Sequence, residues 1–433
     1  MKKALSILLI LALICVPLVA CADTDTPSGT PPAGGGDTPP AGGGDDTPPA
    51  GGGDTPPAGG GDTVTLTLWG GEEDQAMLRE RADAFIAAHA DEATIVINIG
   101  VESESTAKDT ILTDPQAAAD VFTFADDQIM ELYMAGALQP VLLNTDDIKA
   151  RNVASSVSAA SVDGTLVAYP LTADNGYFMF YDKSYFEPSD LESFDRMMEI
   201  AADAGKFIAM ELQGGWYNIA FFRGAGFDAW LAPDGVSTLT NINEAGGTDV
   251  LQGMLDISKN PGFASLGNDE FVTGINDGSV IAGVNGPWNS NNAREAWGDN
   301  YGATKLPTFT VDGRQVQMGG VVGHKLIGVN QFSAEAGWAM RLADWLTNYD
   351  SQVIRFELRG QGPSNIQAAS SPAVQADPAL VALSLQAQYS AFFGPGGNYW
   401  SSMETLGEIV RQGNPDNIPL QEILDNAVAG ITA

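Results

Sequence analysis

The chain has 433 residues, with 20 lysines and arginines against 55 aspartates and glutamates, and a formal net charge of −35. Nucleic-acid backbones and anionic membrane surfaces attract the opposite charge, so neither is expected as a partner. The only two cysteines, Cys15 and Cys21, lie near the amino terminus, so no disulfide, thiolate metal site or cysteine nucleophile is expected after residue 21.

The first twenty residues have the pattern of a bacterial export signal. Lys2 and Lys3 precede an apolar stretch that Pro17 interrupts and that is too short for a transmembrane helix. Residues 18–21 read Leu-Val-Ala-Cys and resemble the lipobox of bacterial lipoproteins. That resemblance implies removal of residues 1–20, a lipidated Cys21 and anchoring on the outer face of the cell membrane. The alternative is an ordinary cleaved signal with a cysteine nearby.

Residues 21–62 are predicted to form a disordered tether. The unit Thr-Pro-Pro-Ala-Gly-Gly-Gly occurs four times between residues 30 and 61, and nothing in it can build a core. Glycine runs make such a segment flexible, with a reach of roughly 35–40 Å for about forty residues. The segment is therefore expected to hold a globular domain near the membrane and leave it free to move.

From residue 63 onward, strand and helix patterns alternate. Residues 63–69 alternate apolar and polar side chains as a half-buried strand does, and residues 78–86 have helical spacing. Further strands are predicted at 94–101, 119–124, 165–169, 177–181, 206–211, 280–284 and 325–329, with a helix at 334–346 and a last helix beginning at Pro419. This order predicts parallel α/β sheets with crossover helices. About 370 residues are too many for one typical domain, so two lobes are expected.

Clusters of polar and aromatic residues lie at the ends of four predicted strands, at residues 69–73, 124–127, 172–175 and 285–288. Ligands of open α/β sheets bind beyond the carboxyl ends of the strands. A carboxylate accepts hydrogen bonds from neighbouring hydroxyls, and aromatic rings lie flat on the apolar faces of sugars. The clusters therefore indicate a site for a neutral oligosaccharide.

Several motifs carry a resemblance to a known family. They are LTLWGGE at 66–72, DVFTFADD at 120–127, AYP at 168–170, NGYFMFYDK at 175–183, NGPW at 285–288 and YGATKLPTF at 301–309. In this order they resemble the extracellular solute-binding proteins of ABC sugar importers, the maltose/maltodextrin-binding protein-like family (solute-binding protein family 1). The resemblance implies a type II periplasmic-binding-protein-like fold, with two α/β lobes around a hinged ligand cleft. It also implies a protein without enzymatic activity or cofactor that delivers a carbohydrate to the transmembrane subunits of a permease. A monomer is the default expectation for a receptor that must open and close.

The resemblance also places the ligand contacts. They are expected at Glu72, Glu73, Phe124, Asp127, Asp174, Trp216, Tyr217, Trp288 and Trp400. The sequence departs from the family where Phe124 replaces a tryptophan, Gly214 a glutamate and Gln128 an arginine, and Asp174 stands in place of a glutamate after a one-residue insertion. These departures leave the particular sugar open. Residues 63–173 and 323–372 are expected to form the amino-terminal lobe, and residues 174–322 and 373–433 the carboxyl-terminal lobe.

Other functions remain as alternatives. Paired carboxylates with aromatic platforms also describe glycoside hydrolases, but the sequence fixes no two carboxylates at a hydrolytic separation. A binder of the same fold for a polyamine or a peptide is the other alternative. The only histidines are His89 and His324, and the sequence has no calcium-loop motif, so no metal site is expected. A Gly-x-Ser-x-Gly nucleophile motif is also missing.

Overall fold

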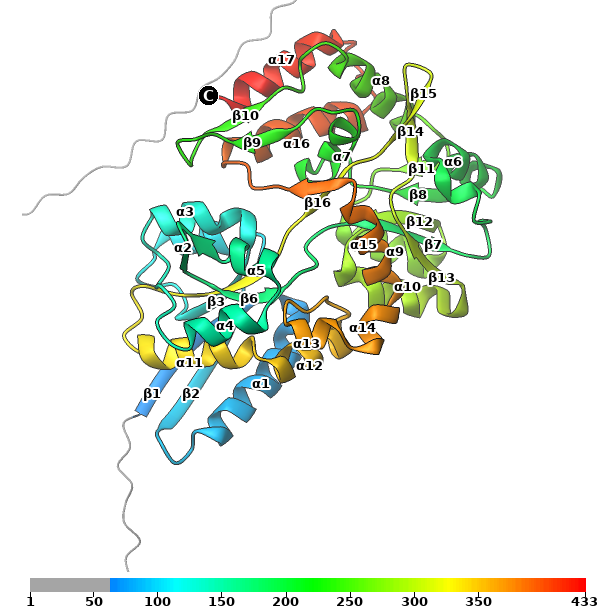
Figure 1. Ribbon diagram of the computed structural model, residues 1–433. Helices are drawn as coiled ribbons and strands as arrows, with labels where there is room; N and C mark the ends of the chain where they lie inside the picture. Colours follow the sequence, from blue (N-terminus) through cyan, green and yellow to red (C-terminus); the bar gives the residue numbers. More distant parts are fainter. Residues whose placement is uncertain (1–62) are drawn as a thin grey trace, which may run out of the picture. The chain divides into compact units, whose positions relative to one another are not determined.

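The computed structural model describes residues 63–433, whose strands form two five-stranded sheets (Figure 1). The predicted export signal, the lipidation of Cys21 and the tether fall on residues 1–62 and lie outside the described residues. Between residues 63 and 433, no helix is long and apolar enough to cross a membrane.

The first sheet contains strands from distant parts of the chain. Its order is β2 (Thr94–Val101), β1 (Thr63–Gly70), β3 (Val121–Ala125), β17 (Lys325–Val329) and β6 (Tyr169–Thr172). Strand β1 runs parallel to β2 and β3, and β17 runs antiparallel to β3 and β6. In β1 the alternation buries Val64, Leu66 and Leu68, whereas every residue of the central β3 is buried. These patterns give β1 one strongly buried face and β3 two.

Helices cover the faces of the first sheet. Helix α1 (Gln75–Ala88) contributes Leu78, Ala82 and Phe85 to the core, and α11 (Ala336–Leu346) packs on β17, β3 and β1. The remaining helices of this part are α2 (Ala107–Thr113), α3 (Ile129–Met134), α4 (Thr145–Arg151), α5 (Ala154–Ala159) and α12 (Tyr349–Arg359).

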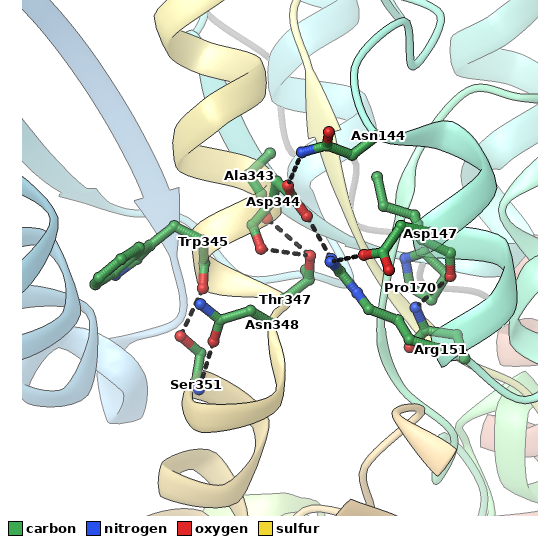
Figure 2. Close-up of polar contacts among 12 residues, drawn as sticks. Asn144, Asp147, Arg151, Pro170, Ala343, Asp344, Trp345, Thr347, Asn348 and Ser351 are labelled. Carbon is green, nitrogen blue, oxygen red and sulfur yellow. Dashed lines mark hydrogen bonds and ion pairs between the residues drawn. The ribbon is translucent and has the colours of Figure 1, made fainter. Parts of the chain in front are cut away.

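Polar contacts join α4 to α11 and set the boundary between α11 and α12 (Figure 2). Arg151 pairs with Asp344 and, at 2.9 Å, with Asp147, and the Asn144 amide donates to Asp344 at 2.8 Å. Asn348 caps α12 by accepting the backbone N–H of Ser351 at 2.9 Å. An oxygen-bearing side chain at this position satisfies a donor that a helix start otherwise leaves free, which explains the break between α11 and α12.

The second sheet has the order β11 (Phe263–Ala264), β8 (Phe207–Ala209), β12 (Val280–Asn285), β7 (Phe178–Asp182) and β13 (Tyr301–Thr304). It has a hydrophobic core on each face. One core involves α6 (Phe194–Asp203), α7 (Gly215–Gly224), α8 (Gly247–Ser258), α16 (Asn398–Arg411) and α17 (Leu420–Ile431). The other involves α9 (Asn268–Asp277), α10 (Ser290–Trp297) and α15 (Pro378–Ala387).

Smaller elements complete the fold. The two-stranded sheets are β4–β5 (Ser161–Val162, Thr165–Leu166), β9–β10 (Ala229–Leu231, Thr238–Thr240), β14–β15 (Thr308–Val311, Arg314–Gln317) and β16–β18 (Gly320–Val322, Ser390–Phe392). The chain passes between the two large sheets at three places: between β6 and β7, between β16 and β17, and through α13 (Ile366–Ala369) and α14 (Pro372–Ala376).

The structure confirms the two-lobe α/β class and corrects three details. The sheets are mixed rather than parallel, because β17 and β7 start at the edge between the lobes and run back against their neighbours. The strand predicted at 165–169 is broken into β5 and β6, because the N–H groups of Val167 and Ala168 both turn to the carbonyl of Ala160. The last helix begins at Leu420, one residue after Pro419.

Candidate ligand-binding cleft

A cavity of about 960 Å³ lies between the two sheets, at the edge of each sheet where its parallel strands end. On the first lobe, Glu73 follows β1, Glu104 follows β2, and Asp127 follows β3. These three strands are parallel, so their carboxyl ends meet at one edge and bring together three carboxylates that are distant in sequence. Lys325 lies at the same edge because β17 runs antiparallel to β3 and Lys325 is its first residue.

The second lobe supplies the other wall by the same rule. Glu211 follows β8, Asn268 opens α9 after β11, and Trp288 follows β12. Strands β11, β8 and β12 are parallel, so these residues share the edge that faces the first lobe. Helices α7 and α16 add Trp216 and Trp400.

Four aromatic side chains line the cleft: Trp216, Tyr217, Trp288 and Trp400. Trp216 and Trp400 both pack on Phe393, with ring centroids 6.3 and 5.9 Å from it. Trp400 also meets Tyr399 edge to face at 5.1 Å, and the Tyr399 hydroxyl donates to the Gly215 carbonyl at 2.8 Å. Contacts from α7, α16 and residue 393 therefore hold these two indoles in place before any ligand binds.

Trp288 is held by the backbone before it. A Cβ at Gly286 would lie 2.1 Å from the Trp288 ring, so only glycine allows the indole to lie against this chain segment. Pro287 opens the helical turn that contains Trp288. The Lys325 Nζ lies 5.5 Å from the ring centroid, within the range of a cation–π contact. The motif at 285–288 thus fixes the orientation of one aromatic platform.

Charges in the cleft are mostly negative. Eight carboxylates line it, from Glu73, Asp74, Glu104, Asp109, Asp127, Glu131, Glu211 and Glu404. Three cations face them, from Lys108, Lys325 and Arg359. Lys108 pairs with Glu131 at 3.0 Å and with Asp109 at 3.5 Å, and Lys325 pairs with Glu104.

A buried charge network lies at the base of the cleft. The Asp74 carboxylate accepts hydrogen bonds from the guanidinium groups of Arg355 at 2.5 Å and Arg359 at 2.9 Å. Arg355 also donates to the side-chain oxygen of Gln361 at 2.7 Å. Burial alone would raise the pKa of Asp74, but these arginines, with Lys325, lower it to about 2. Burial would likewise lower the pKa of Lys325, but Glu104, Asp174 and Asp74 hold it above its ordinary value.

Four of the cleft carboxylates make no ion pair within residues 63–433: Glu73 and Asp127 on one wall, and Glu211 and Glu404 on the other. Burial and the neighbouring Asp126 raise the pKa of Asp127 to about 7. Burial, with Glu404 and Glu270, also raises the pKa of Glu211. These carboxylates are therefore available to accept hydrogen bonds from a ligand.

The raised pKa of Asp127 predicts a pH-dependent loss of stability. The folded protein holds a proton on this carboxyl that the unfolded chain releases near pH 4, so the contribution of Asp127 is lost as pH rises from about 4 to about 7. We expect Asp127→Asn to flatten this part of the melting temperature profile. Exposed Asp91 provides the control Asp91→Asn, which should leave the profile unchanged. Identical profiles for Asp127→Asn and the parent protein would contradict the assignment.

Six of the nine predicted contact residues line the cleft: Glu73, Asp127, Trp216, Tyr217, Trp288 and Trp400. Glu72 is exposed and lies outside the lining. Phe124 is fully buried beside Phe122 in the hydrophobic core of the first lobe, and it lies outside the cleft lining. Its strand is covered on both faces, and the lining begins only at Ala125, where the strand ends.

Asp174 is also outside the cleft lining. Its side chain is 3% exposed, and its Oδ2 accepts the backbone N–H of Gly362 at 2.5 Å. The other oxygen has no hydrogen-bond partner among the described residues, and burial raises the pKa of the carboxyl. Asp174 thus links two segments of the chain between the lobes, and the neighbouring Asn175 reaches the cleft instead.

Sequence reasoning missed several lining residues, including Glu104, Glu211, Lys325, Arg359 and Glu404. Two of these residues occupy sequence positions that could have indicated a place in the cleft. Glu211 ends a predicted strand, and Lys325 opens an otherwise apolar strand, where a charge is expensive to bury without a partner. Glu404 lies on a helix, and its spacing gives no comparable indication.

The described residues contain no group of three or more His, Cys, Asp or Glu side chains that could hold a metal ion. His89 Nδ1 lies 2.8 Å from the Phe85 carbonyl, and His324 Nδ1 lies 2.9 Å from Asp126. Both rings are thus engaged by the fold.

This two-lobed fold with a cleft between its sheets is the architecture of solute-binding proteins. The chain belongs to the family described as bacterial extracellular solute-binding protein, whose profile matches residues 80–382. A comparison with curated proteins finds no match.

Several solved structures share the fold. One, solved with acarbose, is 29% identical, with a TM-score of 0.77 over 86% of this chain and 99% of that chain. The maltodextrin binding protein MalE1 from L. casei BL23, without ligand, is 24% identical, with a TM-score of 0.71 over 86% and 99%. The Thermus thermophilus maltotriose binding protein, bound with maltotriose, is 21% identical, with a TM-score of 0.72 over 85% and 99%. At these identities, the last two show the fold alone.

Proposed function

We propose that this solute-binding protein captures a carbohydrate, an oligosaccharide of the maltose/maltodextrin kind, in the cleft between its lobes. The observation that carries the proposal is the set of aromatic platforms and unpaired carboxylates that line this cavity together. A sugar presents apolar ring faces and hydroxyl edges, which these two kinds of side chain bind. A cavity of about 960 Å³ has room for several sugar rings. Similar proteins solved with acarbose and maltotriose add support.

In this proposal Trp216, Tyr217, Trp288 and Trp400 stack on sugar rings, and Glu73, Asp127, Glu211 and Glu404 accept hydrogen bonds from hydroxyls. The lobes comprise residues 63–173 with 323–372, and residues 174–322 with 373–433. They close about the three connections that cross between them. A ligand that contacts both lobes favours the closed form by its differential affinity for that form.

The closed, loaded protein then delivers the sugar to the transmembrane subunits of an ABC permease and performs no catalysis itself. Lipidation of Cys21 and the repeats at residues 30–61 would keep it anchored outside the cell membrane. The excess of carboxylates over cations in the cleft favours one second candidate, a polyamine ligand.

A thermal-shift screen of the purified protein against oligosaccharides, polyamines and peptides tests this function. A ligand that binds only the folded state raises the melting temperature, by an amount that grows with ligand concentration. We expect a shift with one glycan family, and recovery of the glycan intact by mass spectrometry. A shift confined to polyamines or peptides would replace the carbohydrate proposal, and a cleaved glycan would indicate a hydrolase.

A further inference from the structure

A second cavity, of about 190 Å³, adjoins the cleft. It lies between the start of α3 on the first lobe and the β9–β10 hairpin with residues 392–396 on the second. A single water needs about 10–15 Å³ of such space, so the cavity is far larger than a packing defect. Its lining is Asp126, Asp127, Ile129, Met130, Glu131, Asp228, Ala229, Trp230, Leu231, Gly235, Val236, Phe392, Gly394, Pro395 and Gly396.

The two cavities share Asp127 and Glu131 as lining residues. The two cavities therefore adjoin at these carboxylates, and a linear ligand in the main cleft that extended past them would enter the second cavity. The hydroxyls of such a ligand would meet acceptors at the junction, as they do in the main cleft.

The far wall of the second cavity carries exposed apolar side chains. Trp230 is 44% exposed, and Phe392 and Val236 are exposed as well. Single exposed apolar residues need no explanation, but this group surrounds one hollow, with Met130 on the facing lobe. An indole beside two carboxylates is the combination on which the proposed binding of sugar rings in the main cleft rests.

Hydrogen bonds hold this wall in shape. The Asp234 carboxylate accepts the N–H groups of Val236 and Ser237, each at 2.9 Å, which fixes the turn between β9 and β10. The Gly396 N–H donates to the Thr238 hydroxyl at 2.6 Å, which fastens residues 394–396 to the hairpin. The hollow is therefore part of an ordered surface.

The cavity is bounded by both lobes. A Cβ at Gly235 would lie 3.7 Å from the Met130 Cε, and one at Gly394 would lie 3.7 Å from the Asp127 Cα. Residues of the two lobes thus approach each other closely beside the cavity. Opening of the cleft would separate its walls, so a ligand that fills the cavity would favour the closed arrangement.

We propose that the second cavity is an extension subsite that binds one further sugar ring of a linear oligosaccharide, with Trp230 as its stacking side chain. This inference rests on the proposed carbohydrate function and adds a preference for ligand length. A short oligosaccharide occupies the main cleft alone, whereas a longer one passes Asp127 and Glu131 and reaches Trp230.

Calorimetric titration of the full chain with linear α-1,4-linked glucose oligomers of two to seven units tests the inference. For the parent protein we expect affinity to rise by about three- to tenfold when the oligomer becomes long enough to reach Trp230. Trp230→Ala should remove this step, and so should Val236→Trp, which fills the cavity from an exposed position. Phe332→Ala changes an exposed aromatic residue that lines neither cavity and should keep the step.

Equal effects of Trp230→Ala on short and long oligomers, or no effect on either, would overturn the extension subsite while leaving the carbohydrate function in place. If the parent protein binds no oligomer of any length, the carbohydrate function and the subsite both fail. Circular dichroism confirms the folding of each variant. If Trp230→Ala does not fold, the change in affinity with oligomer length is measured on Val236→Trp instead.

Discussion

Replacement of Asp74 by alanine is expected to lower the free energy of unfolding by about 3–5 kcal/mol, because it leaves a buried arginine without its partner. The Asp74 and Arg355 side chains are 9% and 3% exposed, and they meet at 2.5 Å. Once Asp74 is lost, the remaining carbonyl partner, Gln361, carries no charge to offset the guanidinium. Urea unfolding measures the effect as a lower midpoint with an unchanged slope.

The matched control is Asp83→Ala. Asp83 pairs with Arg79 at 3.7 Å, with both side chains about half exposed, so its loss should cost less than about 1 kcal/mol. If Asp74→Ala were no more destabilising than Asp83→Ala, the buried network would not support the base of the cleft. A second test uses acid: because the pKa of Asp74 is lowered to about 2, its contribution should be complete above pH 4 and lost as pH falls towards 2.

Trp288→Ala is expected to weaken oligosaccharide binding by about 1–3 kcal/mol, because it removes a platform that is already held in position. Gly286 leaves space for the indole, and Lys325 lies 5.5 Å from its ring centroid. The loss should be seen by calorimetry for short and long ligands alike, which distinguishes it from the effect of Trp230→Ala.

Trp288→Phe is the matched variant for this test. It keeps an aromatic face of smaller area, so most of the affinity should remain. An unchanged affinity in Trp288→Ala would show that the sugar does not stack on Trp288 and would move the site towards Trp216 and Trp400.

Much of the fold could be predicted from local patterns. Alternation in residues 63–69 and the apolar run at 280–284 predicted strands within one residue of β1 and β12. These strands could be predicted because the burial of side chains along a strand determines the local order of apolar and polar residues in the sequence. The direction of β17 in the sheet leaves no such local pattern in the sequence. It depends on which edge of the sheet the chain enters after crossing from the other lobe, and that is a property of the whole topology.

In the candidate site, too, some features are set by local sequence and others depend on the topology of the whole chain. Trp288 follows from a motif in which glycine, proline and tryptophan are adjacent, so its geometry is set locally. The pairing of Lys325 with Glu104 joins residues 221 positions apart, and no local pattern shows that β17 starts at the edge where β2 ends. Phe124 was placed by family resemblance, and no local pattern shows that it lies outside the cleft lining, because a strand buried on both faces gives no alternation that would separate core side chains from those near a ligand.

The place of β17 in the first sheet has a consequence for the order of events during synthesis. Lys325 pairs with Thr172, 153 residues earlier, and the same strand separates β6 from β3. Until residue 329 has left the ribosome, β3 and β6 have no strand to join them, and each keeps an unpaired edge. Long-range pairing of this kind closes slowly because the loop entropy must be overcome first. The first lobe is thus expected to stay incompletely folded until β17 has been made, and an incompletely folded chain is the form that threads through a narrow export channel.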